Sequence, residues 1–284
     1  MKRTKTLTTL LLLAAGLAVG VAPASAGKGK KKPAATAAAK QGKLTPEHKK
    51  AMAELMGAFK FGMTKDEVIA VLTKQLDERY AEKIAATNDV YTQDKLRKEK
   101  KEEIARVTKS FTTFEGKKAG WDVSIIDTEF AHNTGETMLV YWENQGGKNQ
   151  RRFFFFFEDH LYKMFIALDT KQVAEEQRSF EFFKGLMEQR FGTAAAEGNK
   201  LTWKTGDFMV QAVDKIQFYD AFCLIISDPK ALKQVADARA SRAPEKAADN
   251  NILKSVTEKG PEDKPSLDEG KDVLKGVIED NKKK

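Results

Sequence analysis

The sequence predicts an α+β fold in which helices cover an antiparallel sheet of about seven strands. Before Gly120, apolar residues recur with the period of a helix, and after Gly120 they recur with a period of two. The order of a helix followed by strands then returns from Gln172 onward. We therefore expect an α+β domain over residues 44–240 with two tandem halves, 64–168 and 172–227, each a helix plus a meander.

Two helices begin with capping signals. Thr45 is the expected N-cap of the first helix, and Pro46 suits its first turn. Thr64 and Glu67 form the capping box of the second helix. The positions expected to face the core are Met52, Leu55, Met56 and Phe59 in the first helix and Val68, Leu72, Leu76 and Tyr80 in the second.

A charged insertion at residues 77–110 follows. Its second part, Asp94 to Ser110, reads as a helix rich in Lys and Glu with a thin apolar line. Such a helix is expected to be mostly solvated, so the insertion predicts a projecting helical hairpin.

The remaining elements are read from the change of period. A helix is expected from Gln172 to Phe191, ending at Gly192, and another begins at Asp228-Pro229. The predicted strands are Trp121–Asp127, Thr137–Glu143, Arg151–Phe157, Leu161–Leu168, Lys200–Lys204, Phe208–Val213 and Phe222–Ser227.

Residues 1–26 have the order of a secretory signal peptide. A positive start precedes an apolar stretch from Leu10 to Val21, and Ala24-Ser25-Ala26 offers a cleavage site before Gly27. The apolar stretch is too short for a membrane span, and no Cys lies nearby for lipid attachment. The sequence thus predicts a periplasmic or secreted protein that does not span the membrane.

The net charge of +8 is concentrated near the start of the chain, because nine positive charges precede Leu44 and the rest is close to neutral. This distribution argues against a specific nucleic-acid partner. The arm at 27–43 is expected to be disordered, and its cluster Lys28, Lys30, Lys31 and Lys32 is a candidate for weak contact with an anionic surface. The alternative is a plain spacer.

The tail at 241–284 reads as flexible and charged, with a short amphipathic helix at 266–280. Its apolar stripe is a candidate site for a protein partner and consists of Val273, Leu274, Val277 and Ile278.

The run Arg151-Arg152-Phe153-Phe154-Phe155-Phe156-Phe157 has two interpretations. The first is a central strand buried on both faces. The second is a strand with one face, Phe154 and Phe156, lining a groove for a partner, lipid or peptide. The flanking charges act as gatekeepers against aggregation. Cys223, the single cysteine, lies in an apolar run and is interpreted as a buried, inert strand residue rather than a reactive thiol.

The segment from Phe59 to Val68, with Gly62-Met63-Thr64 before Glu67-Val68, resembles a known module. It is similar to the α-α-β-β-β domain of BamE-type (SmpA/OmlA) outer-membrane assembly lipoproteins and of β-lactamase-inhibitory proteins. The resemblance implies a periplasmic, non-catalytic binding module, arranged here in tandem. The chain departs from the lipoproteins in lacking a lipidated Cys and in carrying the charged insertion.

No pattern of catalytic or metal-ligating residues stands out. The three histidines are scattered, and the Glu158-Asp159-His160 triplet fits a tight turn. The sequence therefore predicts no catalytic site, no cofactor and no metal.

These observations lead to one main functional hypothesis, a non-catalytic exported binding or scaffold protein that contacts an envelope protein through its sheet or sheet edge. Two alternatives stay open, a secreted hydrolase with an unrecognised site and a carrier of an apolar ligand between the helices and the Phe-rich sheet.

Overall fold

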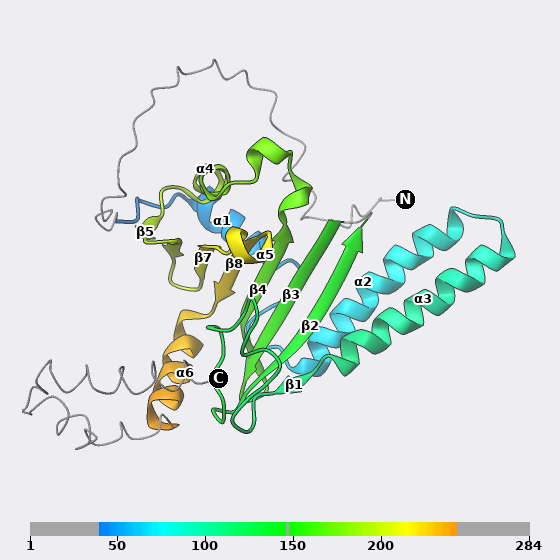
Figure 1. The fold of residues 1–284 in the computed structure, drawn as a ribbon, viewed down its shortest axis with the longest axis horizontal. Coiled ribbons are helices and arrows are strands. Elements are labelled where there is room, and N and C mark those ends of the chain that lie inside the picture. The colour runs from blue at the N-terminus through cyan, green and yellow to red at the C-terminus, as the bar shows by residue number, and fades with distance from the viewer. Residues whose placement is uncertain (1–39, 146–147, 243–284) are drawn as a thin grey trace, which may run out of the picture. The chain divides into compact units, whose positions relative to one another are not determined.

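The computed structural model describes residues 40–145 and 148–242 (Figure 1). The predicted signal peptide, the arm up to Ala39 and the tail beyond Arg242 lie outside the described residues. The helices are α1 Pro46–Glu54, α2 Lys65–Ala85, α3 Val90–Lys109, α4 Phe180–Phe191, α5 Ile216–Tyr219 and α6 Pro229–Arg242, with short 3-10 turns at Thr170–Gln172 and Glu175–Gln177. The strands are β1 Thr112–Thr113, β2 Glu136–Gln145, β3 Lys148–Phe157, β4 His160–Asp169, β5 Ala195–Glu197, β6 Lys200–Lys204, β7 Met209–Asp214 and β8 Ala221–Ser227.

The predicted α+β class with an antiparallel sheet is confirmed. One eight-stranded sheet has the order β1-β2-β3-β4-β8-β7-β6-β5, and all neighbours are antiparallel. The meander β2-β3-β4 thus meets the meander β6-β7-β8 through their last strands, β4 and β8. The two strands that sequence patterning missed, β1 and β5, are two and three residues long, too short for any periodicity.

The predicted N-cap at Thr45 and the predicted capping box of Thr64 and Glu67 both form, and α1 has a capping box as well. The Glu67 amide donates to Thr64 Oγ1 at 3.3 Å, and the Thr64 amide donates to Glu67 Oε2 at 2.8 Å. At α1, His48 takes the place of the acidic residue, and its Nδ1 accepts from the Thr45 amide at 3.3 Å. These contacts satisfy amides that the first turn of a helix leaves without partners.

The predicted strand Trp121–Asp127 is wrong, because this segment forms a series of turns. The Asp127 amide donates to the Ser124 carbonyl at 3.1 Å, and the Asp122 side chain accepts from the Ala119 amide. Short polar side chains that bond to nearby backbone compete with strand pairing. Ile125 and Ile126 are still buried, so the apolar residues of this segment indicated burial correctly although the segment is not a strand.

Two helix starts also differ from the prediction. The helix expected from Gln172 begins only at Phe180, where Ser179 Oγ accepts from the Phe182 amide at 3.2 Å. The helix expected from Asp94 begins earlier, at Val90, because Asp89 caps it by accepting from the Thr92 amide at 2.8 Å. In both cases the local N-cap, rather than the apolar pattern, sets the start.

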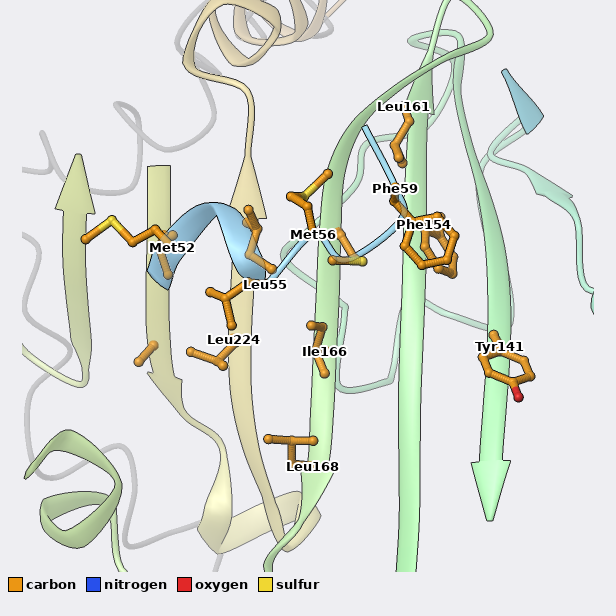
Figure 2. Close-up of a cluster of buried hydrophobic side chains, with 14 of the residues drawn as sticks. Met52, Leu55, Met56, Phe59, Tyr141, Phe154, Leu161, Ile166, Leu168 and Leu224 are labelled. Atoms are coloured by element: carbon orange, nitrogen blue, oxygen red, sulfur yellow. The ribbon is translucent and has the colours of Figure 1, made fainter. Parts of the chain in front are cut away.

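The core lies on both faces of the sheet. One face is covered by α1, α2 and α4, and Figure 2 shows Met52, Leu55, Met56 and Phe59 reaching from the α1 region onto the strands. The opposite face is covered by the segment 114–130 and by α6 through Val235.

Alternate residues of β3 serve these two layers. Phe154 and Phe156 enter the helix-covered layer, and Phe153 and Phe155 enter the other; all four are 0% exposed. The Phe59 ring lies 4.8 Å from the Phe154 ring. The chain's own side chains therefore cover β3 on both sides.

Replacing Phe155 with Ala is expected to lower the free energy of unfolding by on the order of 3–5 kcal/mol, because a closely packed site cannot collapse around the lost ring. Denaturant melts of the two proteins measure the difference. Phe157→Ala is the matched control, since Phe157 is only half-buried at the end of the same strand. Equal losses for both variants would mean that Phe155 does not hold a central place in the core.

Candidate functional site

The structure first settles where the sequence-derived candidates lie. Phe154 and Phe156 are fully buried beneath the helices and line no open groove. The other candidates lie outside the described residues, and they are Lys28, Lys30, Lys31, Lys32, Val273, Leu274, Val277 and Ile278. Cys223 is 0% exposed, and burial raises the pKa of its thiol to about 12, which keeps it protonated and unreactive.

The Glu158-Asp159-His160 triplet forms the predicted tight turn, between β3 and β4. Glu158 and Asp159 both have positive φ, 48° and 62°, as a two-residue hairpin turn requires. The turn borders a hollow of about 200 Å³ that Gly62, Tyr162 and Asp228 also line. The His160 ring nitrogen Nδ1 lies 2.6 Å from the Glu158 carbonyl oxygen, so these residues bond to their own turn.

A buried ionic cluster at the foot of the α2–α3 hairpin was not predicted from the sequence. The Glu103 carboxylate accepts hydrogen bonds from Arg79 at 2.5 Å, Tyr80 at 2.9 Å and Tyr141 at 3.2 Å. Arg79 also donates to Glu143 on β2 at 3.2 Å. Burial and the neighbouring Glu103 carboxylate raise the pKa of Tyr80 to about 12. The cluster joins both helices to the sheet and fixes the base of the hairpin.

A second buried cluster joins α6 to the opposite face. Glu136 has a fully buried side chain and receives Arg239 through two short bonds, at 2.7 and 2.6 Å. The Tyr162 hydroxyl donates to the same carboxylate at 2.7 Å, and Thr134 donates at 2.8 Å. Burial alone would raise the pKa of Glu136, but its hydrogen bonds and the Arg239 charge outweigh burial and lower that pKa. Because all of these hydrogen bonds join Glu136 to other residues of the fold, the cluster has a structural role and fixes α6 against the sheet.

Large apolar side chains that remain exposed mark a different kind of site. Among the described residues these are Val90 and Tyr91 at the start of α3, Val123, Trp142 on β2 and Phe218 on α5. Trp142 differs from the others because it lies within the sheet itself, and it is 56% exposed. An exposed Trp is a frequent anchor of protein interfaces.

Trp142 lies where one edge of the sheet is open. The short strand β1 pairs only with Thr137 and Met138 of β2. Ser110 Oγ then takes over at Val140, accepting from its amide at 2.9 Å and lying 2.8 Å from its carbonyl oxygen. Because backbone groups alternate along a strand, the N–H and C=O of Trp142 turn the same way as those of Val140, away from β3. No further strand of the described sheet lies on that side of Trp142 (Figure 1).

The other edge of the sheet is covered differently. The Gln41 side-chain amide donates to the Lys204 carbonyl at 3.1 Å and accepts from the Lys204 amide at 2.7 Å. The Gly42 amide donates to the Thr193 carbonyl at 3.0 Å. The chain before α1 thus occupies the edge of β6, whereas no hydrogen bond from the described residues reaches the outward backbone groups of Trp142 on β2.

Arg151 stands directly opposite Trp142 on β3. Its guanidinium carbon lies 5.2 Å from the centre of the Trp142 ring, a cation–π contact. Within residues 40–145 and 148–242, no hydrogen bond or ion pair engages the Arg151 guanidinium, and partial burial lowers its pKa. Arg152, on the opposite face, pairs with Glu143 at 3.7 Å. We call Trp142, Arg151 and the open side of β2 the Trp142 edge.

The sequence pattern predicted only part of this site. From it, Trp142 was expected in a strand and Arg151 was interpreted as a gatekeeper of the Phe run. That β2 is an edge strand, and that Arg151 lies against Trp142, follow only from strand order and register, which periodicity does not contain.

Comparisons with known proteins found no matching family model, no matching curated protein and no matching solved structure. The described residues contain no group of His, Cys, Asp and Glu side chains arranged to hold a metal ion. Within the same residues, no helix combines the length and apolar character needed to cross a membrane.

Replacing Arg239 with Met is expected to destabilise the protein by on the order of 3 kcal/mol at neutral pH, because Glu136 would stay buried without its cation. In the wild type, the pKa of Glu136 is lower in the folded protein than in the unfolded chain. The ionised Glu136 therefore stabilises the fold at pH values above its unfolded-state pKa, and this stabilisation is lost as the pH falls through its folded-state pKa. In the variant the carboxyl protonates more readily, so the difference between the two proteins should shrink toward acidic pH.

Urea melts at several pH values measure this difference, with exposed Lys233→Met on the same helix as the control. A penalty that does not change with pH would show that Glu136 is not the group left uncompensated.

Proposed function

We propose that the protein is an exported, non-catalytic binding protein that contacts an envelope protein through the Trp142 edge. The single observation that carries the proposal is an exposed Trp at a point on β2 where, in the described part of the chain, no strand lies beside the outward backbone groups. Such an edge accepts an extended segment of another chain, which adds backbone hydrogen bonds while the exposed aromatic side chain adds contact area. Export is part of the proposal and is supported by residues 1–26.

Two further features support a binding role over the alternatives. The carboxylates with the most extensive hydrogen bonding among the described residues, Glu103 and Glu136, are occupied by partners within the fold, which weighs against a hydrolase built on them. The Phe-rich strand is covered on both faces by side chains of the chain itself, which weighs against an apolar-ligand carrier at that position. The resemblance of the Phe59–Val68 segment to periplasmic binding modules points in the same direction.

The proposal predicts that Trp142→Ala abolishes capture of the partner while the free energy of unfolding changes by less than about 1 kcal/mol, the scale of one exposed cation–π contact. Purified tagged mature wild type and Trp142→Ala would each be treated with an amine-reactive crosslinker in periplasmic extract, and the adduct of the wild type quantified with and without excess untagged wild type. A saturable adduct of defined mass is the expected result.

Tyr91→Ala is the matched control, because Tyr91 is also an exposed aromatic residue, 79% exposed, but lies on the helical hairpin. It should leave capture unchanged. If Tyr91→Ala abolishes capture and Trp142→Ala does not, the binding surface is the hairpin and the proposal for the Trp142 edge is wrong.

A further inference from the structure

We infer that the segment received at the Trp142 edge is an extended acidic peptide, whose glutamate pairs with Arg151 across the Trp142 ring. This inference rests on the proposed function, because it names the chemistry of the partner at the same edge. Four observations carry it, namely the open backbone of β2, the position of Arg151, its unused donors and the charges around it.

The backbone of β2 sets where an added strand would lie. Neighbouring strands in a sheet are about 4.8 Å apart, so a peptide beside β2 would place one residue directly opposite Trp142 and on the same face. Ser110 already occupies the edge at Val140, so the added strand would pair from Trp142 onward.

The position of Arg151 brings its charge toward that residue. Arg151 comes from β3, one strand inside the edge, but its guanidinium group extends over the Trp142 ring on β2. A residue opposite Trp142 therefore faces the guanidinium group from the far side of the ring. A Glu side chain is long enough to lean over Trp142, whereas Asp is one carbon shorter and less suited to the distance.

The hydrogen-bonding state of Arg151 favours a carboxylate. A guanidinium group has five N–H donors in a planar fork that matches the two oxygens of a carboxylate. Among the described residues this group contacts the Trp142 ring and makes no hydrogen bond. Partial burial beside Trp142 reduces competition from water, which strengthens a charge-assisted pair formed there.

The neighbouring charges leave Arg151 available. The Asp169 carboxylate acts on Arg151 through its charge, but it accepts hydrogen bonds from the Lys171 amide at 2.9 Å and the Asn149 amide at 3.5 Å. Lys215, on the same side of the sheet, pairs with Asp127 at 3.0 Å. Arg152 projects to the opposite face, where it pairs with Glu143 at 3.7 Å. In the described part of the chain, Arg151 is thus a cation at the Trp142 edge that no carboxylate pairs with.

The test uses the full mature chain and a phage-displayed library of random linear 12-residue peptides. Selected peptides should carry a Glu at a fixed position, flanked by residues of alternating character. The best peptide is then synthesised in three forms, unchanged, with its Glu replaced by Gln, and with the amide of the residue that pairs with Trp142 methylated. Dissociation constants are measured by fluorescence anisotropy against wild type, Trp142→Ala, Arg151→Gln, Arg151→Lys and Lys200→Gln.

In the wild type, replacing the peptide's Glu should weaken binding at least tenfold, the scale of a lost charge-assisted hydrogen bond. In Arg151→Gln the same replacement should change binding by less than about twofold, because the partner charge is gone. Arg151→Lys should retain part of the effect, and Lys200→Gln, which removes a cation from β6 on the same sheet face, should behave as wild type. Methylation of the amide should abolish binding.

The outcomes separate the inference from the proposed function. If peptides bind in a manner that Trp142→Ala abolishes, but their Glu is dispensable or Arg151→Gln binds equally well, the acidic-peptide inference is wrong and the proposed function stands. If no peptide is enriched, or if Trp142→Ala leaves the dissociation constant unchanged, the inference and the proposed function are both wrong. Should Arg151→Gln fail to fold, the comparison of the Glu and Gln peptides on wild type and Arg151→Lys still decides the question.

Discussion

The burial of β3 on both faces is the constraint on which the rest of the structure depends. Four consecutive Phe side chains point alternately into two layers, so each face of the sheet needs its own cover. Helices α1, α2 and α4 supply one layer, and the 114–130 segment with α6 supplies the other. β3 can occupy this place only as an interior strand, and the long strand on its outer side, β2, is left to form most of that edge of the sheet.

Two buried ionic clusters hold these covers in place. Glu103 joins the helical hairpin to β2 on one face, and Glu136 joins α6 to the sheet on the other. Each carboxylate sits at the centre of several donors from different elements, so each fixes orientation as well as contact. By contrast, Arg151 has a cation–π partner but no such set of acceptors among the described residues. That difference separates groups that build the fold from a group available to a ligand.

Sequence reasoning recovered the elements whose signals are local. The Thr64 cap, the buried faces of α1 and α2 and the strand with the Phe run all follow from periodicity and capping chemistry. It failed at 121–127, where Asp and Ser side chains bond to nearby backbone and turn an alternating segment into turns. It also missed both ionic clusters and the Trp142 edge, because strand order, register and the meeting of residues such as Glu103 and Tyr141 depend on tertiary packing.

The central claim is that the backbone of β2 at Trp142 is open in the free protein and becomes paired in the complex. Amide hydrogen exchange at Trp142, followed by NMR with and without bound partner or peptide, tests it most directly. The account predicts fast exchange in the free protein and strong protection in the complex, while the Val140 amide, already bonded to Ser110, changes little. Protection of the Trp142 amide in the free protein, or unchanged exchange at saturating partner, would contradict it.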